Sequence, residues 1–375
     1  MGHFRKRMIS IFMTSTCNMK CMYCYLEKNE GNLARVIDVQ FAKRGIEDFF
    51  LDNEEPAVRF FAEGEPTLAF KEMVEIKEYA DRLSKHRAIY ELQTNGMFGR
   101  SVAEWIRDNI NIVFISLDGP PDIQDALRVT KGGLGTSDIL EKNIRILQEN
   151  PKLQLGIRAT INALNNNRQI EMIDYFYSLG IRIVFGDLIF SSVGSTEKPL
   201  NVGYKEFVDE YIKARKYAEN QGVFYGTMFA ANFDEEVTYA CRACLPTPHL
   251  TVDGYVSCCD MCVRGDSILK ELIYGKYDPI NNLIEYDTEA IRKIRSRRAD
   301  NIEECKNCEV KHYCAGGCLG EALNETGNFW GGKRRFLPSN SLSVGKFGFS
   351  PNQTSLSSPI DRIGVATMKF TGREV

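Results

Sequence analysis

The 375-residue sequence lacks several features that would each place it in a special class of protein. It has no run of 18 apolar residues, so it predicts no membrane-spanning helix. It has no large excess of charge of one sign, because 47 Lys and Arg residues stand against 50 Asp and Glu residues. This balance argues against binding nucleic acid through bulk charge. Charged residues make up 26% and apolar residues 43%, a globular composition that excludes a largely disordered chain.

A secretion signal is also absent. The basic residues Arg5–Arg7 precede the apolar run Met8–Met13, but this run is short and is interrupted by Ser10. No small-residue cleavage site follows it. We therefore interpret the run as a buried strand and predict a cytoplasmic protein.

The 12 cysteines are too few for a disulfide scaffold, and they are not scattered. They fall at positions 17, 21 and 24, then at 241, 244, 258, 259 and 262, and finally at 305, 308, 314 and 318. Cysteines of a hydrophobic core scatter along a chain, whereas metal ligands cluster. Without a secretion signal, such groups predict metal sites rather than disulfides.

Short β-rich runs alternate with amphipathic stretches from residue 8 to about residue 220. The predicted strands are Met8–Met13, Ala57–Phe61, Ile89–Gln93, Ile112–Leu117, Leu153–Ile161 and Ile181–Ile189. The predicted helices lie near 38–51, 68–84, 101–108, 137–149, 166–178 and 203–220. This alternation predicts an α/β fold with parallel strands and crossover helices. Six units favour a partial (β/α)6 TIM-type barrel, with an open doubly wound sheet as the alternative.

Polar or glycine-containing turns follow the first four predicted strands. They contain Cys17, Cys21 and Cys24, then Glu63-Gly64-Glu65-Pro66, then Thr94-Asn95-Gly96, then Ser116, Asp118 and Gly119. Functional loops lie at the carboxyl ends of the strands in both candidate folds. Each segment alone is consistent with an ordinary turn, but together they predict one site.

The region from 241 to 330 differs, because cysteines are dense and the alternation stops. Asp253-Gly254, flanked by apolar residues, predicts a β-hairpin with a type I′ turn. We predict a barrel over 1–220, a linker over 221–240 and a cysteine-rich domain of a hairpin and short helices over 241–330. The tail, 331–375, carries seven serines and seven basic against two acidic residues, and we expect it to be poorly ordered.

The first cysteine group has the pattern Cys17-x3-Cys21-x2-Cys24. Three thiolates on one tight loop suit three irons of a [4Fe–4S] cluster, which leaves the fourth iron open to a substrate. A structural zinc ion and free thiols are the alternatives. Zinc requires a fourth nearby ligand, and none is evident.

This spacing, with Tyr23 before the third cysteine, resembles the signature of radical S-adenosylmethionine (SAM) enzymes over residues 8–220. The resemblance implies a cluster on the three cysteines that passes one electron to SAM, which then yields a 5′-deoxyadenosyl radical. It also implies which residues contact SAM. They are Tyr23, the turn Glu63-Gly64-Glu65-Pro66 (where Glu63 replaces the family's first glycine), Thr94, Asn95, Ser116, Asp118 at the ribose, and Arg128 at the carboxylate. For Arg128, a surface salt bridge is the alternative.

The later cysteines resemble the SPASM extension of radical SAM enzymes, which binds auxiliary [4Fe–4S] clusters. The resemblance implies one cluster on Cys241, Cys244, Cys259 and Cys318, and a second that begins with Cys305, Cys308 and Cys314. A zinc ribbon is the alternative. The sequence has no cysteine after Cys318, so the second cluster lacks its usual fourth ligand. A non-cysteine ligand, an open iron or an altered tail would each account for this.

Asp260 directly follows Cys259. In anaerobic sulfatase-maturating enzymes, an Asp after the matching cysteine is the base that deprotonates the substrate. The resemblance therefore predicts Asp260 as a catalytic residue. The alternative is a capping residue beside the hairpin.

SPASM enzymes mostly modify peptides or proteins, so the predicted function is hydrogen abstraction from such a substrate, as in ribosomal peptide maturation. The alternatives are a sulfatase maturase that forms formylglycine, which the length and Asp260 favour, and a non-catalytic iron–sulfur protein. The expected partners are the peptide or protein substrate and a reductant such as flavodoxin or ferredoxin. Because only 16 residues precede Cys17, leader recognition would need a separate leader-binding protein or a different mode of recognition. No nucleic acid or membrane partner is expected.

Overall fold

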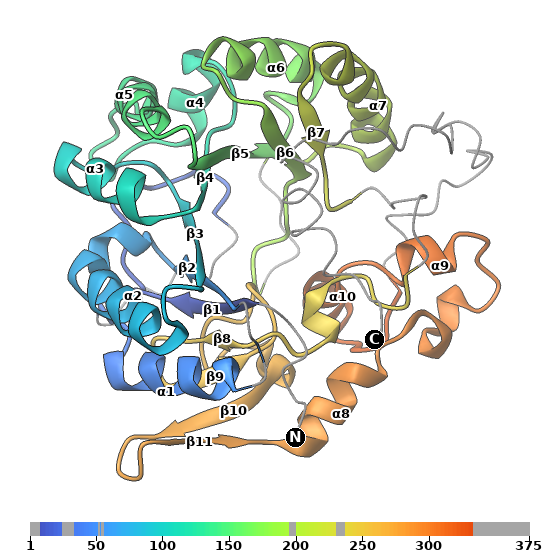
Figure 1. Cartoon of the computed structure of the whole chain (residues 1–375). Coiled ribbons are helices and arrows are strands. Elements are labelled where there is room, and N and C mark those ends of the chain that lie inside the picture. Colours follow the sequence, from blue (N-terminus) through green and yellow to red (C-terminus); the bar gives the residue numbers. More distant parts are fainter. Residues whose placement is uncertain are drawn as a thin grey trace.

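The computed structural model describes residues 8–24, 34–51, 53, 56–194, 200–229 and 237–332. Within them, eleven strands form one sheet in the order β11-β10-β9-β8-β1-β2-β3-β4-β5-β6-β7 (Figure 1). Strands β1 to β7 follow the chain order, and each is parallel to the next. A doubly wound sheet reverses its strand order at a switch point. The unbroken order therefore matches the predicted partial barrel and not the alternative.

The seven parallel strands are β1 (Met8–Phe12), β2 (Ala57–Phe61), β3 (Ile89–Thr94), β4 (Ile112–Ser116), β5 (Gln154–Ile161), β6 (Ile183–Leu188) and β7 (Phe224–Gly226). The six predicted strands are all present. The seventh, β7, lies inside the stretch that the sequence analysis assigned to a linker. Its three residues are too few to show an alternating pattern. The barrel sheet therefore continues beyond residue 220.

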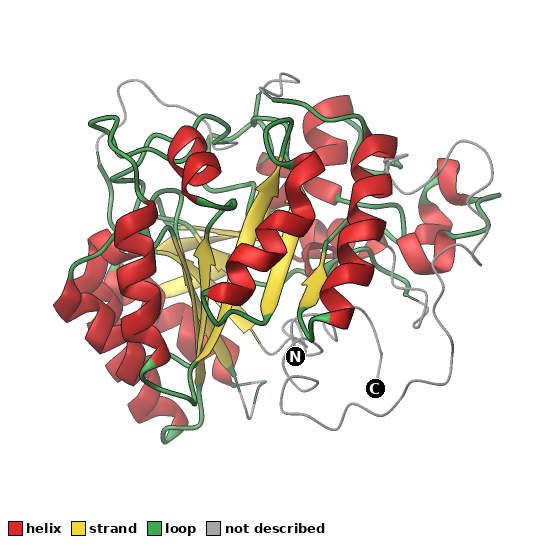
Figure 2. Cartoon of the chain, turned by 90° about the horizontal axis from the view of Figure 1, so that it is seen from above, coloured by secondary structure: helices red, strands yellow, loops and turns green. Residues whose placement is uncertain are grey.

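One layer of helices covers the outer face of the curved sheet (Figures 1 and 2). They are α1 (Val39–Phe50), α2 (Phe70–Ser84), α3 (Arg100–Asn109), α4 (Pro121–Leu127), α5 (Ser137–Gln148), α6 (Gln169–Ser178) and α7 (Tyr204–Asn220). Local signals begin them: the Asp38 side chain caps α1, and Pro121 opens α4. The sequence analysis missed α4, because seven residues show too little periodicity to identify a helix.

The cysteine-rich region extends the same sheet. β8 (His249–Leu250) is parallel to β1, and β9 (Tyr255–Ser257), β10 (Ile273–Asp278) and β11 (Leu283–Tyr286) continue antiparallel. Helices α8 (Thr288–Ser296), α9 (Lys311–Cys314) and α10 (Leu319–Thr326) follow. The hairpin β8–β9 is present, but its predicted type I′ turn is wrong. That turn needs a positive φ at both central residues, and of Asp253 and Gly254 only the glycine has one, at +87°.

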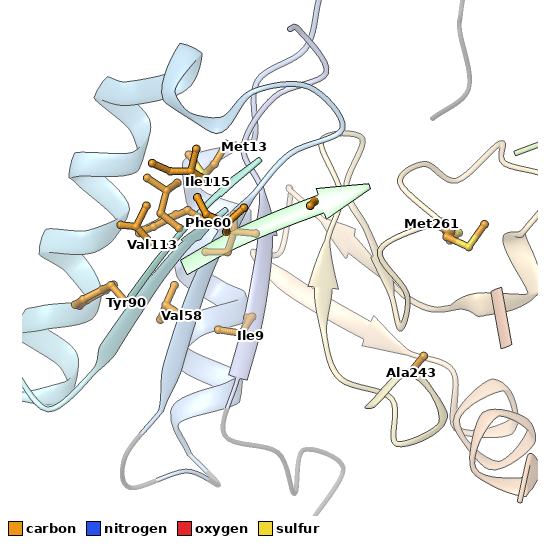
Figure 3. Close-up of a cluster of buried hydrophobic side chains, with 14 of the residues drawn as sticks. Ile9, Met13, Val58, Phe60, Tyr90, Val113, Ile115, Ala243 and Met261 are labelled. Carbon is orange, nitrogen blue, oxygen red and sulfur yellow. The ribbon is translucent and has the colours of Figure 1, made fainter. Parts of the chain in front are cut away.

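A continuous hydrophobic core connects the barrel with the cysteine-rich region. Alternate residues of β1 to β4 point toward the helices, among them Ile9, Met13, Val58, Phe60, Val113 and Ile115 (Figure 3). The same cluster includes Ala243 and Met261 of the cysteine-rich region. The two regions, predicted as separate domains, therefore share one sheet and one core in the described part of the chain.

In the ranges that the structure describes, no helix is long and apolar enough to cross a membrane. Apart from residues 331 and 332, the predicted tail lies outside the described residues.

Candidate active site

Cys17, Cys21 and Cys24 lie on the loop that follows β1, at the carboxyl end of the strand. Cys17 and Cys21 are half-buried, and Cys24 is exposed. Burial raises the pKa of the Cys17 thiol and raises the pKa of Cys21 to about 11, while the positive charge of Arg128 opposes both shifts. The loop is thus partly shielded from water but open at one edge.

Backbone pairing fixes the conformation of this cysteine loop. The amides of Lys20 and Met22 donate to the carbonyl oxygens of Val129 and Leu127, at 2.9 and 3.0 Å. These acceptors lie at and just beyond the end of α4. The segment that follows the fourth strand therefore supports the loop that follows the first.

Gly64, in the turn after β2, packs directly against the backbone that leads to Cys17. The Gly64 amide donates to the Thr14 carbonyl at 3.1 Å, and the Glu65 amide donates to the Thr16 carbonyl at 2.8 Å. A Cβ atom on Gly64 would lie 1.8 Å from the Thr16 carbonyl oxygen. Only glycine permits this approach.

Glu65 connects the turn after β2 to the turn after β3. Its buried Oε1 accepts hydrogen bonds from the Thr67 amide (3.1 Å), the Thr67 hydroxyl (2.7 Å) and the Thr94 hydroxyl (2.6 Å). Its Oε2 accepts one from the Asn95 amide at 2.7 Å. Burial raises the pKa of Glu65, and these four donors oppose the shift. Glu65 therefore positions Thr94 and Asn95, and its direct contact with SAM stays a prediction.

Asn95 carries this connection on to the cysteine loop. Its Nδ2 donates to Cys17 Sγ at 3.7 Å and to Asn18 Oδ1 at 2.8 Å. Its Oδ1 accepts a hydrogen bond from the Met97 amide at 2.9 Å. The turns after β1, β2 and β3 thus form one hydrogen-bonded network around Cys17. The sequence analysis predicted that these turns lie close together.

Glu63, which stands where the family has glycine, points toward the cysteine-rich region. Its side chain is largely buried, and Oε1 lies 3.6 Å from Nε of Arg264 in the loop after β9. This ion pair joins the barrel to the cysteine-rich region. The role of Glu63 in binding SAM stays a prediction.

Tyr23, Asp118 and Arg128 form a buried chain beside the cysteines. The Tyr23 hydroxyl donates to Asp118 Oδ2, and Arg128 Nη1 donates to the Tyr23 oxygen at 2.7 Å. Asp118 Oδ1 accepts from the Thr160 amide at 2.9 Å, and the Asp118 side chain has no exposed surface. Each carboxylate oxygen of Asp118 thus accepts a hydrogen bond inside the protein, and its contact with a ribose hydroxyl stays a prediction.

Arg128 is only 8% exposed, which rules out the alternative of a surface salt bridge. Its Nε is buried and has no hydrogen-bond partner in the described residues. A buried guanidinium N–H without an acceptor is costly, so this atom marks a place where an anionic or carbonyl ligand fits.

Ser116 ends β4, is half-buried and pairs in register with Arg158 of β5. Because Ile157 and Ala159 belong to the core on the helix side, Arg158 points to the inner side of the sheet. There it forms an ion pair with Asp187 of β6. The sequence analysis missed this pair, although a charged residue within an otherwise apolar strand was a usable signal.

The predicted auxiliary ligands interact in two sets. Burial raises the pKa of Cys318 and of Cys314 to about 12. The charges of Glu321 and Cys241 add to the shift of Cys318, and those of Cys305 and Cys308 add to the shift of Cys314. The first set, linked by mutual electrostatic interactions, contains Cys241, Cys244, Cys259 and Cys318, and the buried Cys258 interacts with it as well. The second contains Cys305, Cys308 and Cys314. The assignment of these thiols to two iron–sulfur clusters stays a prediction.

Asp260 forms an ion-pair cluster between β2 and the hairpin. Its carboxylate binds the Arg59 guanidinium through both oxygens, with Nη1 at 3.2 Å, and its Oδ1 lies 2.8 Å from His249 Nε2. Arg242 Nη2 lies at 3.6 Å. Burial acts to raise the pKa of Asp260, but these positive groups outweigh it and hold that pKa well below its usual range. Asp260 is thus held in an ion-pair cluster, and its role as a catalytic base stays a prediction.

The cysteine groups and Arg128 have the chemistry that [4Fe–4S] clusters and SAM would require. In the described part of the chain, no three His, Cys, Asp or Glu side chains are arranged to hold a single metal ion. A [4Fe–4S] cluster instead takes each thiolate on a different iron, and thiols alone make up each cysteine group. The unpartnered Nε of Arg128 suits a carboxylate-bearing ligand near the cysteine loop.

Comparison with known proteins identifies a family similarity over much of the barrel region. Residues 11–174 match the radical SAM superfamily. Fe-coproporphyrin III synthase from Methanosarcina barkeri is 30% identical over 49% of this chain and 44% of its own length. The cysteine-type anaerobic sulfatase-maturating enzyme from Clostridium novyi is 28% identical over 44% of this chain and 46% of its own length. The matched part is thus less than half of either relative.

Two solved structures share the fold over most of the chain. A structure of anSMEcpe with bound AdoMet and the Kp18Cys peptide has a TM-score of 0.66 at 18% identity, covering 84% of this chain and 90% of that one. The structure of Streptococcus suis SuiB bound to precursor peptide SuiA also has a TM-score of 0.66, at 17% identity. This match covers 89% of this chain and 76% of the SuiB chain. Both alignments extend through the cysteine-rich half, so the fold similarity is not confined to the barrel.

Proposed function

We propose that this chain, whose residues 11–174 match the radical SAM superfamily, is a radical SAM enzyme that abstracts hydrogen from a peptide or protein substrate. When bound together, a reduced [4Fe–4S] cluster and SAM supply the 5′-deoxyadenosyl radical for this chemistry. The chain's own residues must then hold these groups, orient the substrate and exclude water.

One observation carries the proposal: the loops after β1, β2 and β3 are tied together around Cys17. Gly64 lies against the backbone before Cys17, Glu65 holds Asn95, and Asn95 donates to the Cys17 sulfur. Three independent turns would not need such a network. A site that must hold a cluster and its ligand in fixed positions relative to each other does need such a network.

In this proposal, Cys17, Cys21 and Cys24 each bind one iron. Arg128 offers its unpartnered Nε to the carboxylate of SAM. Tyr23 and Asp118 hold the Arg128 guanidinium in place by their hydrogen bonds. The positive charge of Arg128 also favours a bound anion, because a buried carboxylate needs a partner of opposite charge.

A peptide or protein substrate is supported by the two solved structures that share the fold and contain peptides. We expect the peptide to enter on the inner side of the sheet, where Arg158 and Asp187 supply paired charges that side chains or backbone amides can bind. On this basis the chain acts in the maturation of a ribosomally made peptide.

A second candidate is the formation of formylglycine in a sulfatase. Two observations favour it: Asp260 directly follows Cys259, and a curated relative is a sulfatase-maturating enzyme. The ion pair of Asp260 with Arg59 weighs against it, because a carboxylate held by a guanidinium is a poor base. Peptides that carry a Cys-x-Pro-x-Arg or Ser-x-Pro-x-Arg core decide between the two.

We also propose that the cysteine-rich half holds auxiliary clusters, one on Cys241, Cys244, Cys259 and Cys318 and one that begins with Cys305, Cys308 and Cys314. The two sets of interacting thiols support this assignment. The twelve cysteines all carry free thiols, as cluster ligands must before they bind iron, and this suits a cytoplasmic location.

The electron is expected to come from an acidic carrier such as flavodoxin or ferredoxin. A pocket of about 450 Å³ lies beside Cys21, and its lining includes Lys20 and Lys131. Met22 and Leu134 are 50% and 71% exposed on the same two paired segments. Neither segment, 18–24 or 128–135, contains an acidic residue, so a negatively charged carrier is favoured there.

Anaerobic reconstitution with iron, sulfide, dithionite and SAM tests the proposal. We expect 5′-deoxyadenosine from the wild type and none from Cys24→Ala. No product from the wild type would support the non-catalytic iron–sulfur alternative instead. Mass loss from the sulfatase-type peptides would identify formylglycine formation, and its absence would count against that candidate.

A further inference from the structure

Arg297 is the largest fully buried side chain of the described residues, and the active site proposed above does not use it. It directly follows α8 and lies among the cysteine-rich segments. A long charged side chain is almost never fully buried unless it is paired. The identity of its partner is therefore informative.

The guanidinium of Arg297 donates to four backbone carbonyl oxygens, which come from two short segments of the chain. Its Nε donates to Phe329 at 3.0 Å, its Nη1 to Gly317 at 3.1 Å, and its Nη2 to Gly316 at 3.2 Å and to Gly331 at 3.0 Å. The chain is bent to present two of these oxygens, because Gly316 and Gly317 both have positive φ, at +80° and +70°. These contacts satisfy the donors but leave the charge unpaired.

No carboxylate neutralises Arg297 in the part of the chain that the structure describes. The ion pairs nearby in the sequence belong to other residues: Arg292 with Glu289, Lys293 with Glu271, and Lys311 with Asp300. One anionic candidate is the Cys244 sulfur, 3.9 Å from Nη1. A buried charge without a counter-charge costs several kcal/mol, so an anion is expected here.

Arg297 also lies between the two sets of thiols. Its positive charge acts on Cys244 and Cys318 of the first set and on Cys305 of the second. Gly316 and Gly317 stand between Cys314 of the second set and Cys318 of the first. The same guanidinium therefore faces both predicted cluster sites.

We propose that Arg297 is a positioning residue, the shared buried counter-charge of two anionic, thiolate-bound iron–sulfur clusters. The inference rests on the proposed function, since it needs the auxiliary clusters. One-electron reduction makes such a cluster more negative, with no bond broken and no proton taken up. A fixed positive charge beside it therefore stabilises the reduced form and raises its reduction potential.

The test uses the full chain with Cys17, Cys21 and Cys24 changed to Ala, so that only auxiliary clusters can contribute. Iron content, iron release to a chelator, and midpoint potentials from an EPR-monitored dithionite titration are measured. Arg297→Gln keeps donors but loses the charge, and Arg297→Lys keeps the charge but loses the planar fork. Arg292→Gln, on the exposed side of α8, is the matched control.

We expect Arg297→Gln to release iron ~10-fold faster and to lower the potentials, which is the scale of outer-shell changes at metal sites. Arg297→Lys and Arg292→Gln should stay close to the parent. If Arg297→Gln and Arg297→Lys change iron release and midpoint potentials equally, Arg297 acts only through its hydrogen bonds, and the proposal is overturned. A folded Gln variant with unchanged iron release and potentials would also overturn it.

Circular dichroism checks folding in each variant. If Arg297→Gln does not fold, Arg297→Lys decides: parent-like potentials support the proposal, and lowered potentials overturn it. A parent that binds no iron would overturn both Arg297 and the auxiliary clusters of the proposed function. A parent that holds iron while Arg297 has no effect would overturn only the present inference.

Discussion

Gly64→Ala tests whether the turn after β2 must lie directly against the cysteine loop. The added Cβ would sit 1.8 Å from the Thr16 carbonyl oxygen, and such contacts essentially never fall under 3.0 Å. The backbone must therefore separate by 3.0 − 1.8 = 1.2 Å or more. That movement breaks the hydrogen bonds from Gly64 to Thr14 and from Glu65 to Thr16, at about 1 kcal/mol each, so we expect about 2 kcal/mol lower stability.

The larger effect should fall on activity, because Cys17 is attached to the displaced segment. A misplacement of about 1 Å can lower a rate ~100-fold. We expect 5′-deoxyadenosine formation to fall by that order, measured anaerobically with SAM and dithionite. Gly99→Ala is the control, since a Cβ there meets nothing within 4 Å and its φ is −77°. If the Gly64→Ala enzyme forms 5′-deoxyadenosine at a rate within about threefold of the wild type, the close backbone contact at Gly64 does not position Cys17.

Three further perturbations address other parts of the site. Glu65→Ala should leave four buried donors unpaired and destabilise the chain by more than about 3 kcal/mol, seen as a lower urea midpoint; an unchanged midpoint would contradict the connecting role of Glu65. In a double-mutant cycle of Arg59→Ala and Asp260→Ala, we expect each single change to cost about 2 kcal/mol and the double change to cost less than their sum; additive losses would mean that the pair does not couple. Lys131→Glu should slow reduction by an acidic carrier protein ~10-fold at low salt and leave dithionite reduction unchanged, whereas equal rates with the carrier would place its docking site elsewhere.

Much of the site was predictable because its chemistry is local in sequence. The spacing of Cys17, Cys21 and Cys24 puts three thiols on one loop whatever surrounds them. Alternating strands and helices require parallel pairing, and parallel pairing brings the turns after successive strands to one edge. The neighbourhood of Glu65, Asn95 and Cys17 follows from that rule alone.

Residue roles were less predictable, because they depend on which donors meet in space. Asp118 was expected at a ribose, yet it is buried against Tyr23 and Thr160. Asp260 was predicted as a catalytic base or a cap beside the hairpin, and the structure adds an ion pair with Arg59, 201 positions earlier in the chain. Neither contact leaves a local pattern in the sequence.

The sequence by itself determined the class of fold and the position of the thiol groups, since strand periodicity and cysteine spacing act over a few residues. Only the tertiary structure decided how the two halves join. β8 pairs with β1 and continues one sheet, so the cysteine-rich region shares the barrel's core instead of folding as a separate unit. The tertiary structure also decided which charged groups meet: Glu63 lies beside Arg264, and Arg297 lies beside the Cys244 thiol. Electrostatic interactions depend on distance and burial and not on separation along the chain.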